Sequence, residues 1–167
     1  MSGSADVHKA IVSAWVNNGL NAIFKAYWDS SKMSAYEVLH DQEAGPAQPF
    51  PYCVYEIEQG RTTDKMSASD LTRPTSRNEV RSIPITFNIH TRSLTAGNTA
   101  KKVGSALLDE VLKVFGGHPS TEPATLNLDN GAALLMRYET DWAIREGDQN
   151  YVWHVRYSVI VDVPVAN

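Results

Sequence analysis

The chain has 167 residues, a formal net charge of −4 at pH 7 and a pI of about 5.7. A chain of this length buries roughly two-thirds of the surface that its unfolded form exposes. We therefore expect one domain, spanning residues 1–167, that needs no disulfide or metal for stability. The acidic balance argues against bulk or sequence-specific binding to nucleic acid, which requires a basic face, although a local basic patch remains allowed.

The single cysteine, Cys53, lies within an expected strand. It has no partner for an intramolecular disulfide and cannot build a cysteine-rich metal site, so we interpret it as a small buried side chain in a protein of a reducing compartment. No run approaches the ~20 apolar residues of a membrane helix, and residues 1–4 do not begin a secretory signal. We therefore expect no membrane association.

Residues 5–28 carry apolar side chains at helical spacing, with Ser4 as the expected N-cap. The run Asn17-Asn18-Gly19 interrupts the pattern and predicts two helices rather than one. A connection follows, in which residues 36–39 are a candidate short strand. Prolines between 46 and 51 then stiffen the chain and lead it, extended, into the next strand.

Two alternating segments, residues 52–59 and 80–91, predict strands with one buried face. Pro84 interrupts the second, and because proline has no N–H it should face an open edge or a bulge. Between these strands, residues 60–79 show no apolar period, which is unusual for a connection in a compact domain. We expect this stretch to be functional or to become ordered with a partner.

The third part of the chain contains its clearest patterns. Residues 98–115 predict an amphipathic helix, capped by Asn98 or Thr99 and ended by Gly116-Gly117. Residues 132–144 and 151–163 alternate strictly and should pair as an antiparallel hairpin. The order of elements predicts an α+β fold: an antiparallel sheet of about four strands with helices packed on one face.

Sequence motifs for catalysis or metal binding are weak. His90 and His154 fall on polar strand faces, but no histidine has a metal-ligating partner at a typical spacing. Glu139 and Asp141, two apart on a strand, share a face and have one requirement of an acid–base pair, although a solvated or ion-paired face is the commoner role. Glu56 and Glu58 have the same spacing.

A nucleophilic triad can be drawn only from Ser158, His154 and Asp162, at intervals of four along one strand. Residues four apart on a strand are about 13 Å apart, beyond hydrogen-bonding reach, so this set is excluded unless a bulge intervenes. There is also no phosphate-binding loop, nucleophile elbow or zinc-protease motif. We therefore expect no enzymatic activity and no cofactor.

The layout as a whole is similar to a known family. A proline-rich lead-in reaches Pro51-Tyr52-Cys53-Val54-Tyr55, a long polar stretch precedes a strand that ends in Thr91-Arg92-Ser93, and a helix covers residues 100–108. The last strand contains residues 154–159, His-Val-Arg-Tyr-Ser-Val. Over about residues 5–163 this order resembles the tail-terminator, or tail-completion, proteins of long-tailed bacteriophages.

The resemblance implies a single tail-terminator-like domain that forms a hexameric ring in the virion. Such a ring caps the finished tail tube and meets the head–tail connector or neck proteins, and DNA passes through its lumen without sequence-specific binding. The implied protein is structural and is assembled in the bacterial cytoplasm. Its expected partners are copies of itself, the tail-tube protein and the connector.

The stretch 60–79 is the expected contact with a neighbouring subunit or the tube, because it carries enough charge for reciprocal ion pairs. Its expected interface residues are Arg61, Lys65, Asp70, Arg73 and Arg77. Three alternatives stay open: a neck or head–tail adaptor ring protein, a small hydrolase that uses Glu139 and Asp141 or a hidden triad, and a ligand-binding α+β module.

Overall fold

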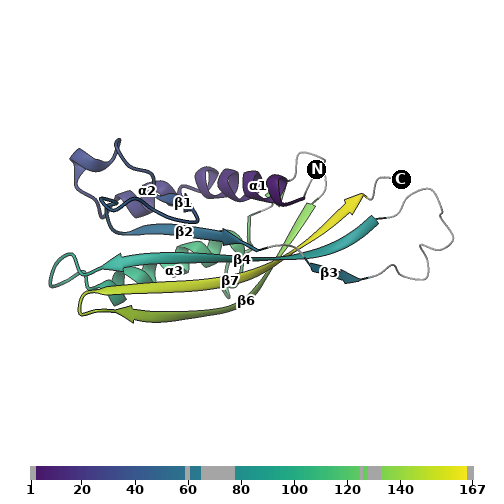
Figure 1. Cartoon of the computed structure of the whole chain (residues 1–167). Coiled ribbons are helices and arrows are strands. Elements are labelled where there is room, and N and C mark those ends of the chain that lie inside the picture. The colour runs from purple at the N-terminus through teal and green to yellow at the C-terminus, as the bar shows by residue number, and fades with distance from the viewer. Residues whose placement is uncertain (1–2, 59–60, 65–77, 125, 128–132, 165–167) are drawn as a thin grey trace.

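The computed structural model describes residues 3–58, 61–64, 78–124, 126–127 and 133–164 (Figure 1). The helical elements are α1 (Gly3–Asn17), α2 (Leu20–Lys25), the short 3-10 helix η1 (Ser30–Lys32) and α3 (Ala100–Phe115). The strands are β1 (Leu39–Asp41), β2 (Tyr52–Ile57), β3 (Arg61–Asp64), β4 (Asn78–Arg92), β5 (Leu126–Asn127), β6 (Ala133–Glu146) and β7 (Asn150–Pro164).

The fold is α+β, as the sequence predicts, but the sheet is mixed. Its strand order is β1-β2-β4-β7-β6-β5, with β3 also paired to β4. The four expected strands β2, β4, β7 and β6 pair in an antiparallel manner, whereas β1 runs parallel to β2. The expectation of a purely antiparallel sheet of about four strands is therefore wrong, because three short strands extend it and one of them is parallel.

The core lies between the sheet and the helices, which pack on one face. Phe87 of β4 is at its centre: its ring lies 4.7 Å from Phe115 of α3, 6.1 Å from Trp15 of α1 and 5.9 Å from Tyr157 of β7. All four side chains are fully buried. The Tyr157 hydroxyl donates a 2.7 Å hydrogen bond to the carbonyl of Gly116, so this buried phenol has a partner where α3 ends.

The first helical segment divides where the sequence predicts. Gly19 has a positive φ of 73°, the left-handed conformation that ends α1 and redirects the chain into α2. The Trp15 indole N–H donates to Oδ1 of Asn21 at 2.8 Å and ties the two helices together. Ser4 was expected to cap α1, but the helix begins at Gly3 and contains Ser4.

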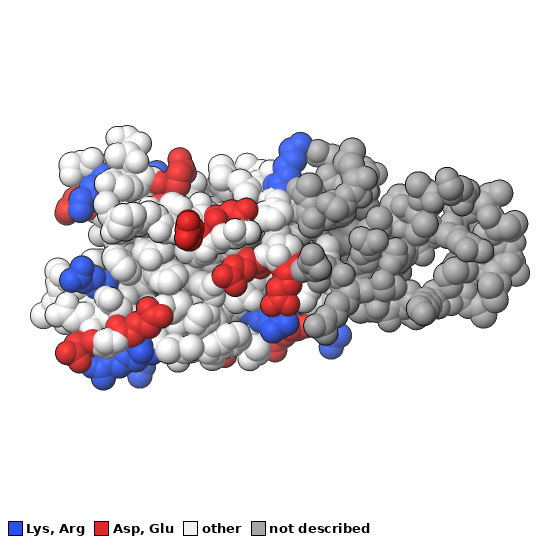
Figure 2. Space-filling view, viewed as in Figure 1, with Lys and Arg blue, Asp and Glu red and all other residues white. Residues whose placement is uncertain are grey.

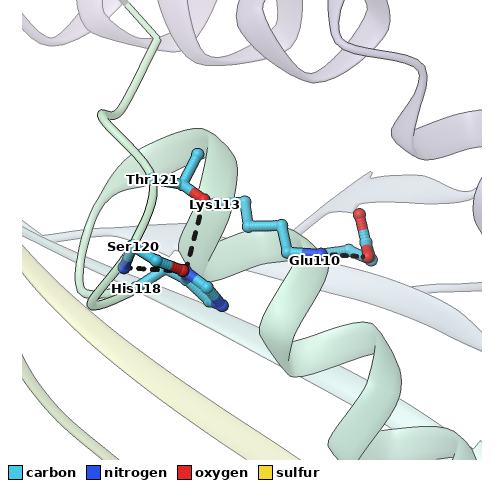
Figure 3. A network of polar contacts seen from close by, with 5 residues as sticks. All are labelled: Glu110, Lys113, His118, Ser120 and Thr121. Atoms are coloured by element: carbon cyan, nitrogen blue, oxygen red, sulfur yellow. Dashed lines mark hydrogen bonds and ion pairs between the residues drawn. The ribbon is translucent and has the colours of Figure 1, made fainter.

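The third helix also follows its sequence signals. Thr99 is the N-cap, and its side chain accepts a hydrogen bond from the Lys102 backbone N–H. Gly116, with φ 117°, ends the helix. On the last turns of α3, Lys113 and Glu110 form an ion pair at 2.8 Å (Figure 3).

Two strands lie where the sequence predicted other structure. The short strand expected at 36–39 begins at Leu39, where the parallel pairing with β2 starts. The stretch 60–79, expected to lack regular structure, contains β3, whose Arg61 pairs with Ser82 of β4. β4 itself begins at Asn78 and extends two residues beyond its predicted start.

Pro84 lies in a central strand, at a break in its neighbour. Its carbonyl accepts from the Glu58 backbone N–H at 2.9 Å, on the side where β2 has ended at Ile57 and β3 has yet to begin. The N–H that proline lacks would point to the same side of the strand. Proline's missing N–H therefore faces the interval between the end of β2 and the start of β3. A proline within a strand requires a position of this kind, where no neighbouring strand needs its donor.

The hairpin of β6 and β7 contains a bulge that the sequence pattern does not reveal. Tyr138 pairs with Tyr157 and Thr140 with Arg156, so Glu139 is an extra residue. Strict alternation predicted one shared face for Leu134, Met136, Tyr138, Trp142 and Ile144. That prediction is wrong beyond the bulge: Tyr138 packs on the core, whereas Trp142 lies opposite His154 on the other face.

Gly104 of α3 provides a test of the packing between helix and sheet. A Cβ atom at this position would lie 1.9 Å from Nε1 of Trp153, so the bare backbone makes room for the indole. Helix propensity alone favours Gly104→Ala by about 1 kcal/mol. Because the clash opposes this, we expect the variant to lose about 1–3 kcal/mol in its free energy of unfolding, measured by urea denaturation.

The exposed Ser105→Ala, one residue along the same helix, is the control and should change stability little. Gly104→Ala in a Trp153→Leu background should be less harmful than in the parental chain. Equal or greater stability of the single Gly104→Ala variant would show that the indole does not require this glycine.

Candidate subunit interface

The face of the sheet that points away from the helices, called here the outer face, is not covered by the helices. It carries apolar, aromatic and charged side chains from the four central strands. Its described members include Tyr52, Val54, Glu56, Asn88, His90, Trp142, Ile144, Val152, His154 and Arg156. Figure 2 looks onto this face and shows a broad uncharged area, in white, with acidic side chains, in red, and basic side chains, in blue, around it.

Apolar side chains on the outer face are unusually prominent. Trp142 is 40% exposed and Ile144 is 49% exposed, on a part of β6 whose described strand partner is β7 alone. Val54 and Val152, on the same face, are nearly buried. A half-covered apolar surface of this kind is typical of a contact with another protein.

A shallow hollow of about 320 Å³ lies on this face, next to the turn between β6 and β7. We call it the outer hollow. It is lined by Gln42, Glu43, Ala44, Tyr52, Val54, Glu56, Asn88, His90, Glu146, Val152 and His154. These residues come from the strands β2, β4, β6 and β7 and from the segment that follows β1, so the register of the sheet brings them together.

Stacked pairs of rings lie in and beside the outer hollow. The rings of Tyr52 and His90 are nearly parallel, with centroids 4.6 Å apart. The Trp142 ring stacks on His154 at 5.0 Å. His154 is held in place by Asn88, whose Oδ1 lies 2.5 Å from Nδ1 and accepts its hydrogen bond. The stacking contacts and this hydrogen bond fix the orientation of the rings in the unbound chain.

Burial controls the charge of the two imidazoles. Desolvation lowers the pKa of His90, and the nearby His154 lowers it further, while Glu146 opposes the shift. Desolvation also lowers the pKa of His154, against the opposing effect of Glu146 and Glu56. Both side chains are therefore neutral near pH 7, and the net charge of the hollow comes from its carboxylates.

Three carboxylates, from Glu43, Glu56 and Glu146, line the outer hollow, and its described lining residues include no lysine or arginine. Two arginines lie on the same face beside it: Arg92, two residues beyond His90 on β4, and Arg156, two residues beyond His154 on β7. Arg156 lies 3.2 Å from Glu139 and 3.8 Å from Glu58. Its Nε is not aligned for a directed hydrogen bond with Glu139, so the contact is an ion pair.

The candidate acid–base pair is not assembled. The bulge places Glu139 beside Arg156, whereas Asp141 lies opposite Val155 and accepts a hydrogen bond from the Tyr138 hydroxyl. The two carboxylates were expected on one face, and that expectation is wrong because the inserted residue turns them to opposite faces. Each has a partner other than the second carboxylate.

The candidate triad is not assembled either. β7 pairs in unbroken register with β4 through Ser158 and His154, so no bulge shortens their separation. The Ser158 hydroxyl lies 2.5 Å from that of Ser82, and His154 contacts Asn88. The side chain of Asp162 lies outside the described residues.

Another polar cluster, after α3, resembles a serine–histidine pair (Figure 3). The Ser120 backbone N–H donates to Nδ1 of His118 at 3.3 Å, and the hydroxyls of Ser120 and Thr121 lie 3.2 and 3.3 Å from the same nitrogen. This arrangement shapes an exposed turn. Figure 3 shows Glu110 turned to Lys113 and away from the imidazole.

Of the predicted interface residues, the structure places only Arg61, whose backbone pairs with Ser82 at the start of β3. The other four, Lys65, Asp70, Arg73 and Arg77, lie outside the described residues.

Sequence reasoning missed the outer hollow. A signal was present, since Val152 and Ile160 interrupt the polar face of the last strand, but no pattern showed that Tyr52 and Trp142 would join that face.

The described part of the chain contains neither a metal-binding cluster nor a membrane-spanning helix. No three His, Cys, Asp or Glu side chains in these parts of the chain gather closely enough to hold a metal ion. Among the described helices, none is both long and apolar enough to cross a bilayer.

Comparison with known proteins gives little guidance. No protein-family model matches the chain, and no curated protein matches it. One solved structure is 14% identical over 90% of this chain and 97% of its own length, with a TM-score of 0.38. At that TM-score the likeness carries no argument about function.

The lowered pKa values of His90 and His154 predict a pH dependence of stability. Near pH 7 both states hold neutral imidazoles. As the pH falls below about 6.5, the unfolded chain binds protons that the folded chain resists, so the free energy of unfolding should fall until both states are protonated. Thermal melts between pH 7.5 and 5 should show a smaller loss for the double variant His90→Gln/His154→Gln than for the parental chain.

The control is His118→Gln, which removes a half-buried imidazole from the turn after α3, away from the outer face, and its melts are compared with those of the double variant. If the double variant loses stability as steeply as the parental chain, burial of these two imidazoles does not govern the acid response.

Proposed function

We propose that this chain is a non-enzymatic structural protein that closes a ring with copies of itself, caps a bacteriophage tail tube and joins it to the head connector or neck. The observation that carries the proposal is the outer face: a sheet surface with Trp142 and Ile144 exposed and no helix over it. The order of elements, which resembles the tail-terminator family, supports the same role.

A second surface suits a ring. Within the described residues, β5 pairs with β6 only at Ala133 and Leu134, so the rest of β6 has a strand partner on one side, β7. Subunits of a ring meet through two different surfaces, one on each neighbour. An open strand edge and an uncovered sheet face are two distinct surfaces of this kind. A neighbouring subunit would pair the free backbone groups of the edge and bury the apolar side chains of the face.

Each candidate catalytic side chain with a described contact is already bound to another residue of the chain. This favours a structural role over a hydrolase. Asp141 is bound by Tyr138, Glu139 by Arg156, and Ser158 by Ser82. A general acid or base needs free access to a substrate proton, which these contacts oppose.

The proposal is tested by the mass of the purified protein in solution, alone and with tail-tube protein. A ring-sized species, six copies if the family resemblance holds, supports it. Negative-stain images of tails that lack heads then separate a terminator from a neck or head–tail adaptor protein, since a terminator stays on such tails. A monomer at all concentrations that also fails to bind tubes would contradict the proposal.

Charge in the stretch 60–79 is expected to contribute to assembly. Arg61→Ala/Arg73→Ala/Arg77→Ala should leave the monomer folded, with an unchanged far-UV circular dichroism spectrum, but weaken the ring in sedimentation velocity because its charge pairs with a neighbour are lost. The matched control is Lys32→Ala/Lys101→Ala/Lys102→Ala, which removes the same charge from exposed positions on helices. Normal rings from the arginine variant would rule out this role.

A further inference from the structure

We propose that the outer hollow is a docking site for residues 65–77 of a second copy of this chain, with an arginine of that segment seated among the carboxylates. The inference rests on the proposed ring and names its two contact surfaces. Three observations lead to it: the surface is uncovered, its charge is unbalanced, and the chain's own segment is too far away to fill it.

The chemistry of the outer hollow favours a guanidinium group. Glu56 and Glu146 supply acceptors beside Tyr52 and His90, whose rings stack on each other. Arginine pairs with carboxylates through a planar set of donors, so carboxylates that line one hollow suit a guanidinium group. A neutral peptide would leave three carboxylates of the hollow without a counter-charge.

Residues 65–77 have the complementary composition. Their sequence, Lys-Met-Ser-Ala-Ser-Asp-Leu-Thr-Arg-Pro-Thr-Ser-Arg, contains Lys65, Arg73 and Arg77 against the single acid Asp70. The segment therefore carries a net charge of +2 (three cations minus one anion), although the whole chain carries −4. Opposite charge on two surfaces of one chain favours contact between copies.

Distance excludes the chain's own segment as the occupant. Asn78 begins β4 and pairs with Pro164, whereas His90 lies at the other end of the strand, opposite Val152. At about 3.3 Å per residue these two ends of β4 are about 40 Å apart. Arg73 precedes Asn78 by five residues and reaches at most about 17 Å from it. The remaining gap of about 20 Å to His90 is far longer than an arginine side chain, so the chain's own Arg73 cannot reach the stacked rings, although Glu56, opposite Thr86, lies nearer to Asn78.

The separation of the two ends of β4 also decides how neighbouring subunits would be arranged. Figure 1 shows β4 and β7 running on beyond the helices, and β3 pairs with β4 at that end, where β3 ends at Asp64 and β4 begins at Asn78. The outer hollow lies at the opposite end, near the turn that links β6 to β7. A contact between the two is head-to-tail, which closes into a ring when the rotation per subunit allows it.

The test uses two full-length variants and their mixture. The hollow variant is Glu56→Gln/Glu146→Gln, and the segment variant is Arg73→Ala/Arg77→Ala. Each should weaken self-association by about thirtyfold in sedimentation velocity, because each removes one side of a charged contact. Mixed at equal concentration, they should form 1:1 dimers that grow no further, since only one intact hollow and one intact segment are present between them.

Controls separate this inference from the proposed ring. Glu37→Gln/Glu122→Gln removes two exposed carboxylates outside the hollow and should assemble like the parental chain. Thermal melts must show that both test variants are folded. A parental chain that stays monomeric would overturn the ring and this contact together.

Two outcomes would overturn the contact alone. In the first, the parental chain assembles and the hollow variant assembles equally well. In the second, the hollow variant fails to assemble but the segment variant succeeds, or their mixture stays monomeric. The hollow would then receive a different occupant.

Discussion

The antiparallel pairing of β4 with β7 is the contact on which the rest of the structure depends. It runs without a shift over the full 15 residues of each strand, from Asn78 opposite Pro164 to Arg92 opposite Asn150. Because side chains alternate along a strand, this register places Ile85, Phe87 and Tyr157 on the helix side and His90 and His154 on the other. A slip of one residue would exchange the two faces, exposing the aromatic core and burying the imidazoles.

Strict alternation in β4 and β7, and the capped amphipathic pattern of α3, were sufficient to predict those elements from sequence. The same reasoning failed on β6, where it assigned Tyr138 and Trp142 to one face. A bulge adds one residue at Glu139 and reverses the phase, yet the apolar residues on either side still fall at even positions, so periodicity alone gives no warning. Only the pairing partner, Tyr157 on one side and Arg156 on the other, reveals the change.

The short strands were predicted poorly for a different reason: the sequence placed a candidate strand at 36–39, which overlaps β1 only at Leu39, and offered none for β3. β1 is fixed by a parallel contact with β2, and β3 consists of polar residues that follow the extended end of β4. Neither has an apolar alternation of its own, because each is stabilised by hydrogen bonds to a longer neighbour. The outer hollow depends on such long-range register, and that is why its residues looked like ordinary polar strand positions in the sequence.

The uncovered sheet face leaves apolar side chains in contact with water, and no described element of the chain shields them. Most antiparallel sheets that face water carry polar side chains there, but this one presents Trp142, Ile144 and stacked rings beside unbalanced carboxylates. The apolar part gains from being covered, and the acidic part limits what covers it to a surface that brings cations. In a ring of identical subunits, every copy offers both the acidic face and whatever basic surface it carries. A head-to-tail contact satisfies both requirements at each interface without a second kind of protein.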